Sequence, residues 1–143
     1  MRDDRFEHAI YRVPLSPLLA FTTAVPTLGV ARAAVAAYHD RLTRHTKRGT
    51  SDALMNQQVA QIRLARADTM VVTAEMLIRN AIKENLRAAD VEGMGTVEFR
   101  NKLRSQFSYA VELCRQAVLL VCEASGTSIH YLSHPMQRYL RDI

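Results

Sequence analysis

Three long stretches of helix-forming sequence, each followed by glycine, are the feature that most constrains what this chain can fold into. Four of the five glycines stand at positions 49, 93, 95 and 126, and Ala, Leu, Arg and Val dominate the stretches between them. Glycine commonly ends a helix because it enters the left-handed region without a Cβ clash. The sequence predicts helices over about 15–46, 52–89 and 96–125, and a short fourth helix over about 135–141.

The expected helix boundaries carry their own start signals. Ser51 or Asp52 can cap the second helix and Thr96 the third, because their side-chain oxygens accept free N–H groups of a first turn. Pro135 suits the first turn of the short helix, where its missing N–H is harmless. Pro26 is expected to bend the first helix, and the arginines near its end suit the negative end of the helix dipole.

Apolar residues at helical spacing indicate the faces that should be buried. In the second helix the expected stripe is Leu54, Ile62, Ala65, Thr69, Val72, Met76 and Leu86. In the third helix it is Leu103, Phe107, Ala110, Cys114, Ala117 and Val121, and residues 117–121 are apolar all round. That part of the third helix should be covered by more than two neighbours.

Three helices of about 30 residues joined by short links predict an all-α fold, an antiparallel up-down bundle. Residues 1–12 are polar and form the expected N-terminal arm, and residues 13–143 form the bundle. Such helices would be about 45 Å long, far beyond a radius of gyration of about 13–15 Å for a compact domain of this size. We therefore expect self-association, through the second and third helices, or packing against a partner domain.

Composition argues against several classes of protein. The net charge of +5 comes from 16 Arg and 3 Lys that are scattered over every segment, so a solvated surface is favoured over a nucleic-acid-binding stripe. Residues 13–31 carry no formal charge, but three prolines and several hydroxyl residues weaken a membrane or signal segment. We expect no nucleic acid or membrane partner and a cytoplasmic location.

Cys114 and Cys122 would lie about 12 Å apart on one helix, too far for a disulfide, and are expected to be small buried hydrophobic residues.

Few residues suggest chemistry. His130 and His134 have a spacing that could hold zinc on a helix, but Pro135 disfavours helical geometry there, and we predict neither a metal site nor catalytic residues. Four methionines (Met55, Met70, Met76, Met94) and the aromatic Phe107 and Tyr109 are expected in the core. The best site candidate is the break Gly126-Thr127-Ser128, where N–H groups and hydroxyls could meet a phosphate or a ring edge.

Several motifs in order resemble the C-terminal helical domain of acyl-CoA dehydrogenase-fold flavoproteins, nearest the flavin-dependent monooxygenase (hydroxylase) branch. They are Val13-Pro14-Leu15 leading to Pro26-x-x-Gly29-x-Ala31-Arg32-Ala33-Ala34, the segment 62–68 (IRLARAD), Arg100 through Ala117, and the close Gln137-Arg138-x-x-Arg141-Asp142. Each motif is weak alone, and their order and spacing are fairly specific. The similarity spans residues 13–143.

The resemblance implies an oxidoreductase fragment rather than a complete enzyme. In these flavoproteins the bundle packs against two further domains, holds the oligomer together and contacts the flavin, often that of a neighbouring subunit. Carried over, Thr127 and Ser128 would bind the flavin (FMN or FAD), and Arg138, Arg141 and Asp142 would form ion pairs that orient the last segment. The chain is expected to form a homo-oligomer, a dimer or tetramer, and to be inactive without the missing flavoprotein domains.

Two other functions remain open from the residues alone. The chain could be a non-enzymatic helical self-association module that kept the bundle without the chemistry. A basic nucleic-acid-binding bundle is the third possibility, although few aromatic residues are placed to stack on bases.

Overall fold

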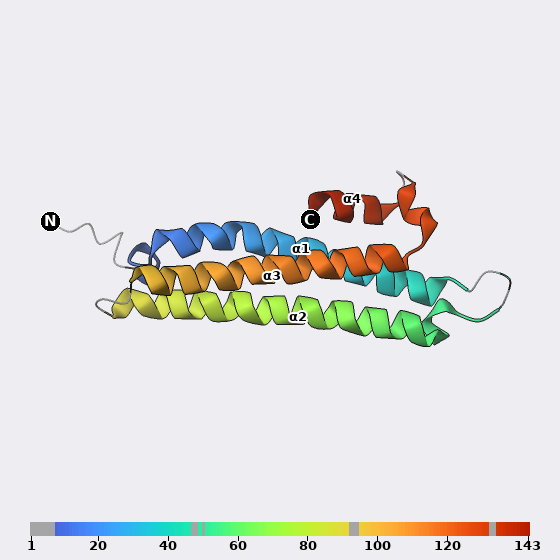
Figure 1. The fold of residues 1–143 in the computed structure, drawn as a ribbon, viewed down its shortest axis with the longest axis horizontal. Helices are drawn as coiled ribbons and strands as arrows, with labels where there is room; N and C mark the ends of the chain where they lie inside the picture. Colours follow the sequence, from blue (N-terminus) through green and yellow to red (C-terminus); the bar gives the residue numbers. More distant parts are fainter. Residues whose placement is uncertain (1–7, 47–48, 50, 92–94, 132–133) are drawn as a thin grey trace.

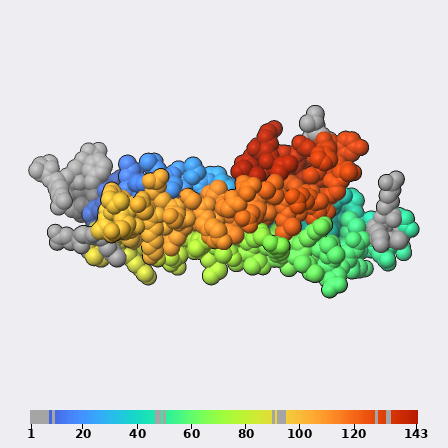
Figure 2. All heavy atoms as spheres, in the orientation of Figure 1, coloured from blue at the N-terminus to red at the C-terminus, as the bar shows by residue number. Residues whose placement is uncertain are grey.

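The computed structural model describes residues 8–46, 49, 51–91, 95–131 and 134–143, with the side chains of Ala9, Asp90 and Ser128 left aside. Three long helices run up, down and up along one another: α1 (Leu15–Arg44), α2 (Gln58–Arg87) and α3 (Val97–Ala124) (Figure 1). A short helix, α4 (Pro135–Asp142), folds back over α1 and α3. The predicted all-α antiparallel bundle is confirmed, and it is an elongated molecule with α4 raised over one end (Figure 2).

Short 3₁₀ turns fill the links: η2 (Ala9–Tyr11), η3 (Leu54–Asn56), η4 (Ala88–Asp90) and η5 (Thr127–His130). Residues 8–12 of the expected arm therefore contain one such turn, and residues 1–7 lie outside the described part. Pro26 lies inside α1, which continues through it to Arg44.

The core is a seam built on a seven-residue repeat. Buried residues recur every seven positions on each helix: Ala24, Ala31 and Tyr38 on α1, Ala60, Ala67, Ala74 and Ala81 on α2, and Leu103, Ala110 and Ala117 on α3. Two helices whose buried residues repeat every seven positions stay in contact along their length. Alanine at so many of these positions lets the backbones approach closely, while a few large side chains such as Tyr38 fill the space between them.

The predicted stripe of α3 is confirmed, because all six of its residues are buried. The whole helix α3 packs against α1, α2 and α4, and Ala117, Val118 and Val121 of the stretch 117–121 are fully buried. The predicted stripe of α2 is wrong. Ile62, Val72 and Met76 are 58%, 47% and 66% exposed, because the helix turns its row of alanines, with Val71 and Ile78, inward and carries these three residues outside.

The start of α2 also differs from the prediction. Residues 52–57 do not begin the helix: Thr46 and Ala53 form an isolated antiparallel bridge, and the Leu54 N–H donates to the His45 carbonyl at 2.9 Å. The η3 turn follows, so α2 begins at Gln58 without a side-chain cap. The chain between α1 and α2 is thus tied back to the end of α1, which ends at Arg44 rather than Thr46.

The other predicted ends match. The Thr96 hydroxyl accepts the Phe99 N–H at 3.2 Å and caps α3, and Pro135 occupies the first turn of α4.

Within the described residues α1 is long and apolar enough to cross a membrane by length and composition alone, with a best window of mean hydropathy 1.5. Core helices of soluble proteins and N-terminal signal sequences pass the same test, so this is weak support for a membrane span.

Candidate functional site

The break after α3 is a tight, ordered turn. The buried Ser125 hydroxyl donates to the Val121 carbonyl at 2.7 Å, and Gly126 then takes a left-handed conformation with φ of 74°. Gly126 therefore ends α3 in the way its position predicts, since a Cβ is strained in this region. Thr127 follows in η5 and is exposed. The turn thus presents Thr127 at the surface, while Ser125 at the start of the turn is buried in the core.

The segment after the turn is anchored by side chains that reach back to it. Ile129 is buried in the core, and its carbonyl accepts the Gln137 side-chain amide at 2.6 Å. His134 caps α4, because its Nδ1 accepts the Met136 N–H at 3.2 Å, and Met136 is 1% exposed. These contacts hold η5 and α4 as one unit over the ends of α1 and α3, so the position of Thr127 is set by the core.

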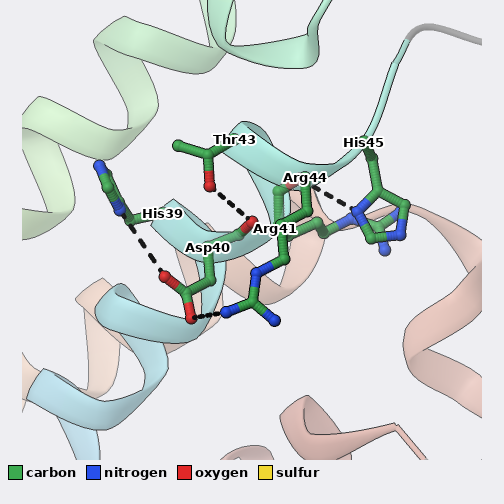
Figure 3. A network of polar contacts seen from close by, with 6 residues as sticks. All are labelled: His39, Asp40, Arg41, Thr43, Arg44 and His45. Atoms are coloured by element: carbon green, nitrogen blue, oxygen red, sulfur yellow. Dashed lines mark hydrogen bonds and ion pairs between the residues drawn. The ribbon is translucent and has the colours of Figure 1, made fainter.

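Positively charged groups gather at this end of the bundle, where α1 ends. Arg41 and Arg44 lie in the last turn of α1, as expected for the helix dipole, and His45 follows. The His45 ring nitrogen Nδ1 lies 3.2 Å from the Arg41 carbonyl, and Arg44 pairs with Asp40 at 3.3 Å (Figure 3). The Thr43 hydroxyl donates to the Asp40 carbonyl at 2.9 Å (Figure 3).

The cap residue of α4 responds to that charge. Burial lowers the pKa of His134, and the positive charges of Arg41 and of His45, when protonated, lower it further. Neutral His134 is also the form that caps α4, because a protonated Nδ1 cannot accept the Met136 N–H. We define the basic end of the bundle as Arg41, His45 and His134.

The free energy of unfolding should therefore decrease as the pH is lowered through the range in which histidine titrates. In the folded state the pKa of His134 lies below the unfolded value of about 6.5. The unfolded chain therefore binds more protons, and lowering the pH stabilises it relative to the folded chain. We expect the melting temperature to decrease between about pH 7.5 and 5.5. Asparagine caps a helix without titrating, so His134→Asn should flatten this part of the profile. His130→Asn is the matched control on an exposed histidine, and an equal flattening there would contradict the assignment.

The closing ion pairs form, but at the surface. Asp142 pairs with Arg141 at 2.9 Å and with Arg138 at 3.5 Å, and both arginine side chains are at least three-quarters exposed. The two arginines lower the pKa of Asp142, Arg141 most of all. The expected pairing is present, yet exposed pairs contribute little to stability, so the packing of Met136 and the Gln137 hydrogen bond orient the last segment.

The remaining candidates are structural. Cys114 and Cys122 are free and buried as predicted, and burial raises the pKa of Cys114 to about 11, so it stays a thiol at neutral pH. Met55 and Met70 pack against the core as expected, Met76 does not, and Met94 lies outside the described residues. Phe107 is buried but Tyr109 is 58% exposed, so the core prediction for Tyr109 is wrong. Among the described residues no group of three metal-binding side chains comes together.

A second surface feature lies between α1 and α2. A groove of about 760 Å³ has Val35, Leu64 and Val71 among its apolar lining residues. Arg32 of α1 and Glu75 of α2 also line it and form an ion pair across it. Glu75 also pairs with Arg79 at 2.7 Å, since residues four apart are neighbours on a helix surface. The groove is also lined by polar residues: Arg32, His39, Asp40, Gln61, Asp68 and Glu75. We call the groove together with the exposed apolar side chains of Ile62, Val72 and Met76 the α2 face.

Comparison with known proteins places the bundle. The family described as "Acyl-CoA dehydrogenase, C-terminal domain" matches residues 21–143, which covers α1 from Phe21 onward, α2, α3, the Gly126 turn and α4. The chain belongs to this family. The acyl-CoA dehydrogenase C-terminal domain is thus the identity of the bundle, and the resemblance inferred from the motifs is confirmed.

One curated relative of this acyl-CoA dehydrogenase C-terminal domain is the FADH(2)-dependent resorcinol hydroxylase, oxygenase component, from Rhizobium sp. (strain MTP-10005). The two are 28% identical over 95% of this chain. The chain spans about a third of that relative's length, 35%.

The turn was predictable and the basic end was not. Gly126-Thr127-Ser128 stands out locally because glycine and hydroxyl residues follow a long helix. Arg41 and His45 are about ninety residues away from His134 in sequence, and only the packing of α4 against α1 brings these residues to one end.

Proposed function

We propose that the chain is the C-terminal helical portion of a flavin-dependent hydroxylase, which contacts the flavin and forms the oligomer but is inactive alone. The observation that carries the proposal is the family match through the Gly126 turn, together with a relative named as FADH2-dependent. The flavin, FMN or FAD, supplies the redox chemistry when bound. The other domains of such an enzyme would supply the rest of the flavin site.

The geometry of the turn fits a role in holding a flavin. Thr127 is exposed on a turn fixed by the buried Ser125 and Ile129, so its hydroxyl and N–H can donate to a molecule outside the bundle. The basic end offers positive charge and histidine donors, which suit phosphate oxygens. Thr127 and Ser128 would orient the flavin, and the basic end would attract its phosphate.

The proposal predicts a selective loss of flavin binding. The test uses a chimera in which this chain replaces the matching third of the Rhizobium hydroxylase. There, Thr127→Ala/Ser128→Ala should weaken flavin binding by about 1–3 kcal/mol, the cost of leaving a buried donor or acceptor without its hydrogen bond. Fluorescence titration of the flavin measures the change. Thr69→Ala, an exposed threonine on α2, is the control and should bind normally.

The isolated chain provides the complementary test. We expect its flavin binding to be weak or undetectable, because most of the site lies in other domains. Saturable binding below about 1 µM, equivalent to more than about 8 kcal/mol, would show that this chain holds a complete site and would contradict the proposed role as one portion of it. Equal flavin binding by the chimera with and without both hydroxyls would remove Thr127 and Ser128 from the site.

The alternative function is a non-enzymatic self-association module. The exposed Ile62, Val72 and Met76 of the α2 face favour it, because exposed apolar side chains are what an interface between copies would cover. Both functions require a homo-oligomer, a dimer or tetramer, and we propose the α2 face as its contact surface. We also propose a cytoplasmic location without nucleic acid or membrane partners, since the arginines are distributed over all helices.

A further inference from the structure

The outer side of α2 carries a second, mainly apolar row that the bundle leaves uncovered. Five residues of the stripe predicted for this helix form the row, and all five are exposed: Ile62, Ala65, Thr69, Val72 and Met76. We call them the outer row. Helix α4 folds over α1 and α3 instead (Figure 1), so the outer row stays open to a partner.

The spacing of the outer row is that of a helix–helix contact. Its members are three, four, three and four residues apart, and they lie within about 80° of arc around the helix at about 100° per residue. The buried alanines, such as Ala67, lie on nearly the opposite side. The Thr69 hydroxyl already donates to the Ala65 carbonyl at 2.8 Å, so covering it strands no donor. Spacings of three and four are those of the a and d positions of a heptad, so α2 carries one seam for its own bundle and one for another helix.

Two charged residues flank the middle of the outer row on opposite sides. Around the helix, Arg66 lies about 60° to one side of Thr69 and Asp68 about 100° to the other. Asp68 accordingly lines the groove between α1 and α2, whereas Arg66 does not. Both are exposed, and within the part of the chain that the structure describes neither forms an ion pair. In the heptad of the outer row Arg66 occupies position e and Asp68 position g, where charges set partner choice and orientation.

These charges select both the partner and its orientation. When two copies of α2 pack in parallel, position e of one copy faces position g of the other. Arg66 then lies beside Gln61 and Asp68 of the second copy, and the Cα atoms of Arg66 and Asp68 differ in height by only about 3 Å. In an antiparallel pair the g positions would face one another instead. That arrangement would set Asp68 and Glu75 of one copy against the same carboxylates of the other, and like charges across a contact are unfavourable.

We propose that the outer row binds a second copy of this chain, with the two α2 helices packed in parallel about a two-fold axis. In such a pair Ile62, Thr69 and Met76 each meet their own counterpart. Two ion pairs form between Arg66 and Asp68, one on each side of the seam. This inference rests on the self-association proposed above, and it adds the orientation of the two copies and the charged pairs that fix it.

Charge reversal in two separate chains tests the ion pairs. Arg66→Glu places a like charge beside Asp68 of the partner, and Asp68→Arg does the same beside Arg66. Each variant alone should self-associate about tenfold more weakly than the wild type, because two attractive pairs become repulsive. An equimolar mixture of the two variants should regain wild-type association, since every pair across the seam then attracts. Sedimentation in low-salt buffer measures the association, because salt screens exposed charges.

Cysteine cross-linking tests the orientation. In a parallel pair, Met76→Cys chains should form a disulfide with each other under oxidation, because identical a positions meet across the seam. In an antiparallel pair, Met76→Cys would link only in a mixture with Ile62→Cys. Both native cysteines are buried and do not compete. Arg104→Glu, an exposed arginine on α3, is the control for charge reversal and should associate like the wild type.

Two results would overturn the parallel pair and leave the α2 face as the contact surface. One is a mixture of the charge variants that associates no better than either variant alone, and the other is Met76→Cys that links only to Ile62→Cys. A wild-type chain that stays monomeric would overturn this inference together with the self-association on which it rests. None of these results bears on flavin binding at the Gly126 turn.

Discussion

Phe107→Ala is expected to lower the free energy of unfolding by about 3–5 kcal/mol, the usual cost of removing a buried aromatic side chain. Phe107 is 3% exposed and packs against Phe21 between α1 and α3. The neighbouring side chains already border a cavity, so removal of the ring leaves a larger void that the long helices cannot close. Urea denaturation at fixed protein concentration measures the loss.

Tyr109→Ala is the matched control, two residues along the same helix. Its side chain is 58% exposed, so its loss should change stability by less than about 0.5 kcal/mol. Similar losses for both variants would mean that α3 is rotated relative to the structure. A small loss for Phe107→Ala would mean that the α1–α3 contact does not hold the bundle together.

Ile62→Lys/Met76→Lys is expected to convert a self-associated chain into monomers. Both side chains project from the α2 face and are more than half exposed, and an interface that covers them would have to bury two unpaired charges. We expect dissociation to become at least tenfold easier for each charge, about 3 kcal/mol together. Sedimentation across micromolar concentrations measures the shift.

The control for that experiment is Val97→Lys at the start of α3, which is 61% exposed and lies away from the α2 face. It should leave the assembly unchanged. A wild-type chain that sediments as a monomer throughout would contradict the proposed self-association. Equal dissociation by the control would place the contact elsewhere.

Local signals predicted the fold well where one residue decides an element end. Thr96, Gly126 and Pro135 each act through their own backbone or side chain, so the ends of α3 and the start of α4 follow from the sequence. Ser51 and Asp52 have the same chemistry as Thr96. They failed as a prediction because the bridge between Thr46 and Ala53 commits that segment to a turn, and such pairing depends on where α1 ends in space.

The buried face of α2 was missed because hydrophobicity and burial do not coincide there. Ile62 and Met76 are more apolar than Ala67 and Ala74, yet the alanines are fully buried. Close helix packing selects small residues, and this preference comes from the neighbouring helices rather than from α2. The candidate turn was likewise visible in the sequence, whereas the basic end required the tertiary contacts.

The alanine row of α2 has a further consequence for how the bundle keeps its alignment. Ala60, Ala67, Ala74 and Ala81 present nearly the same surface every seven residues, which is about 10.5 Å along the axis. If α2 slid by one such step past its neighbours, most of its small contacts would be remade with equivalent partners. The bulky Tyr38, Leu103 and Phe107 break this translational symmetry, because each fits one place only. Those few large side chains therefore make one alignment of the helices more stable than the alignments in which α2 is shifted by seven residues.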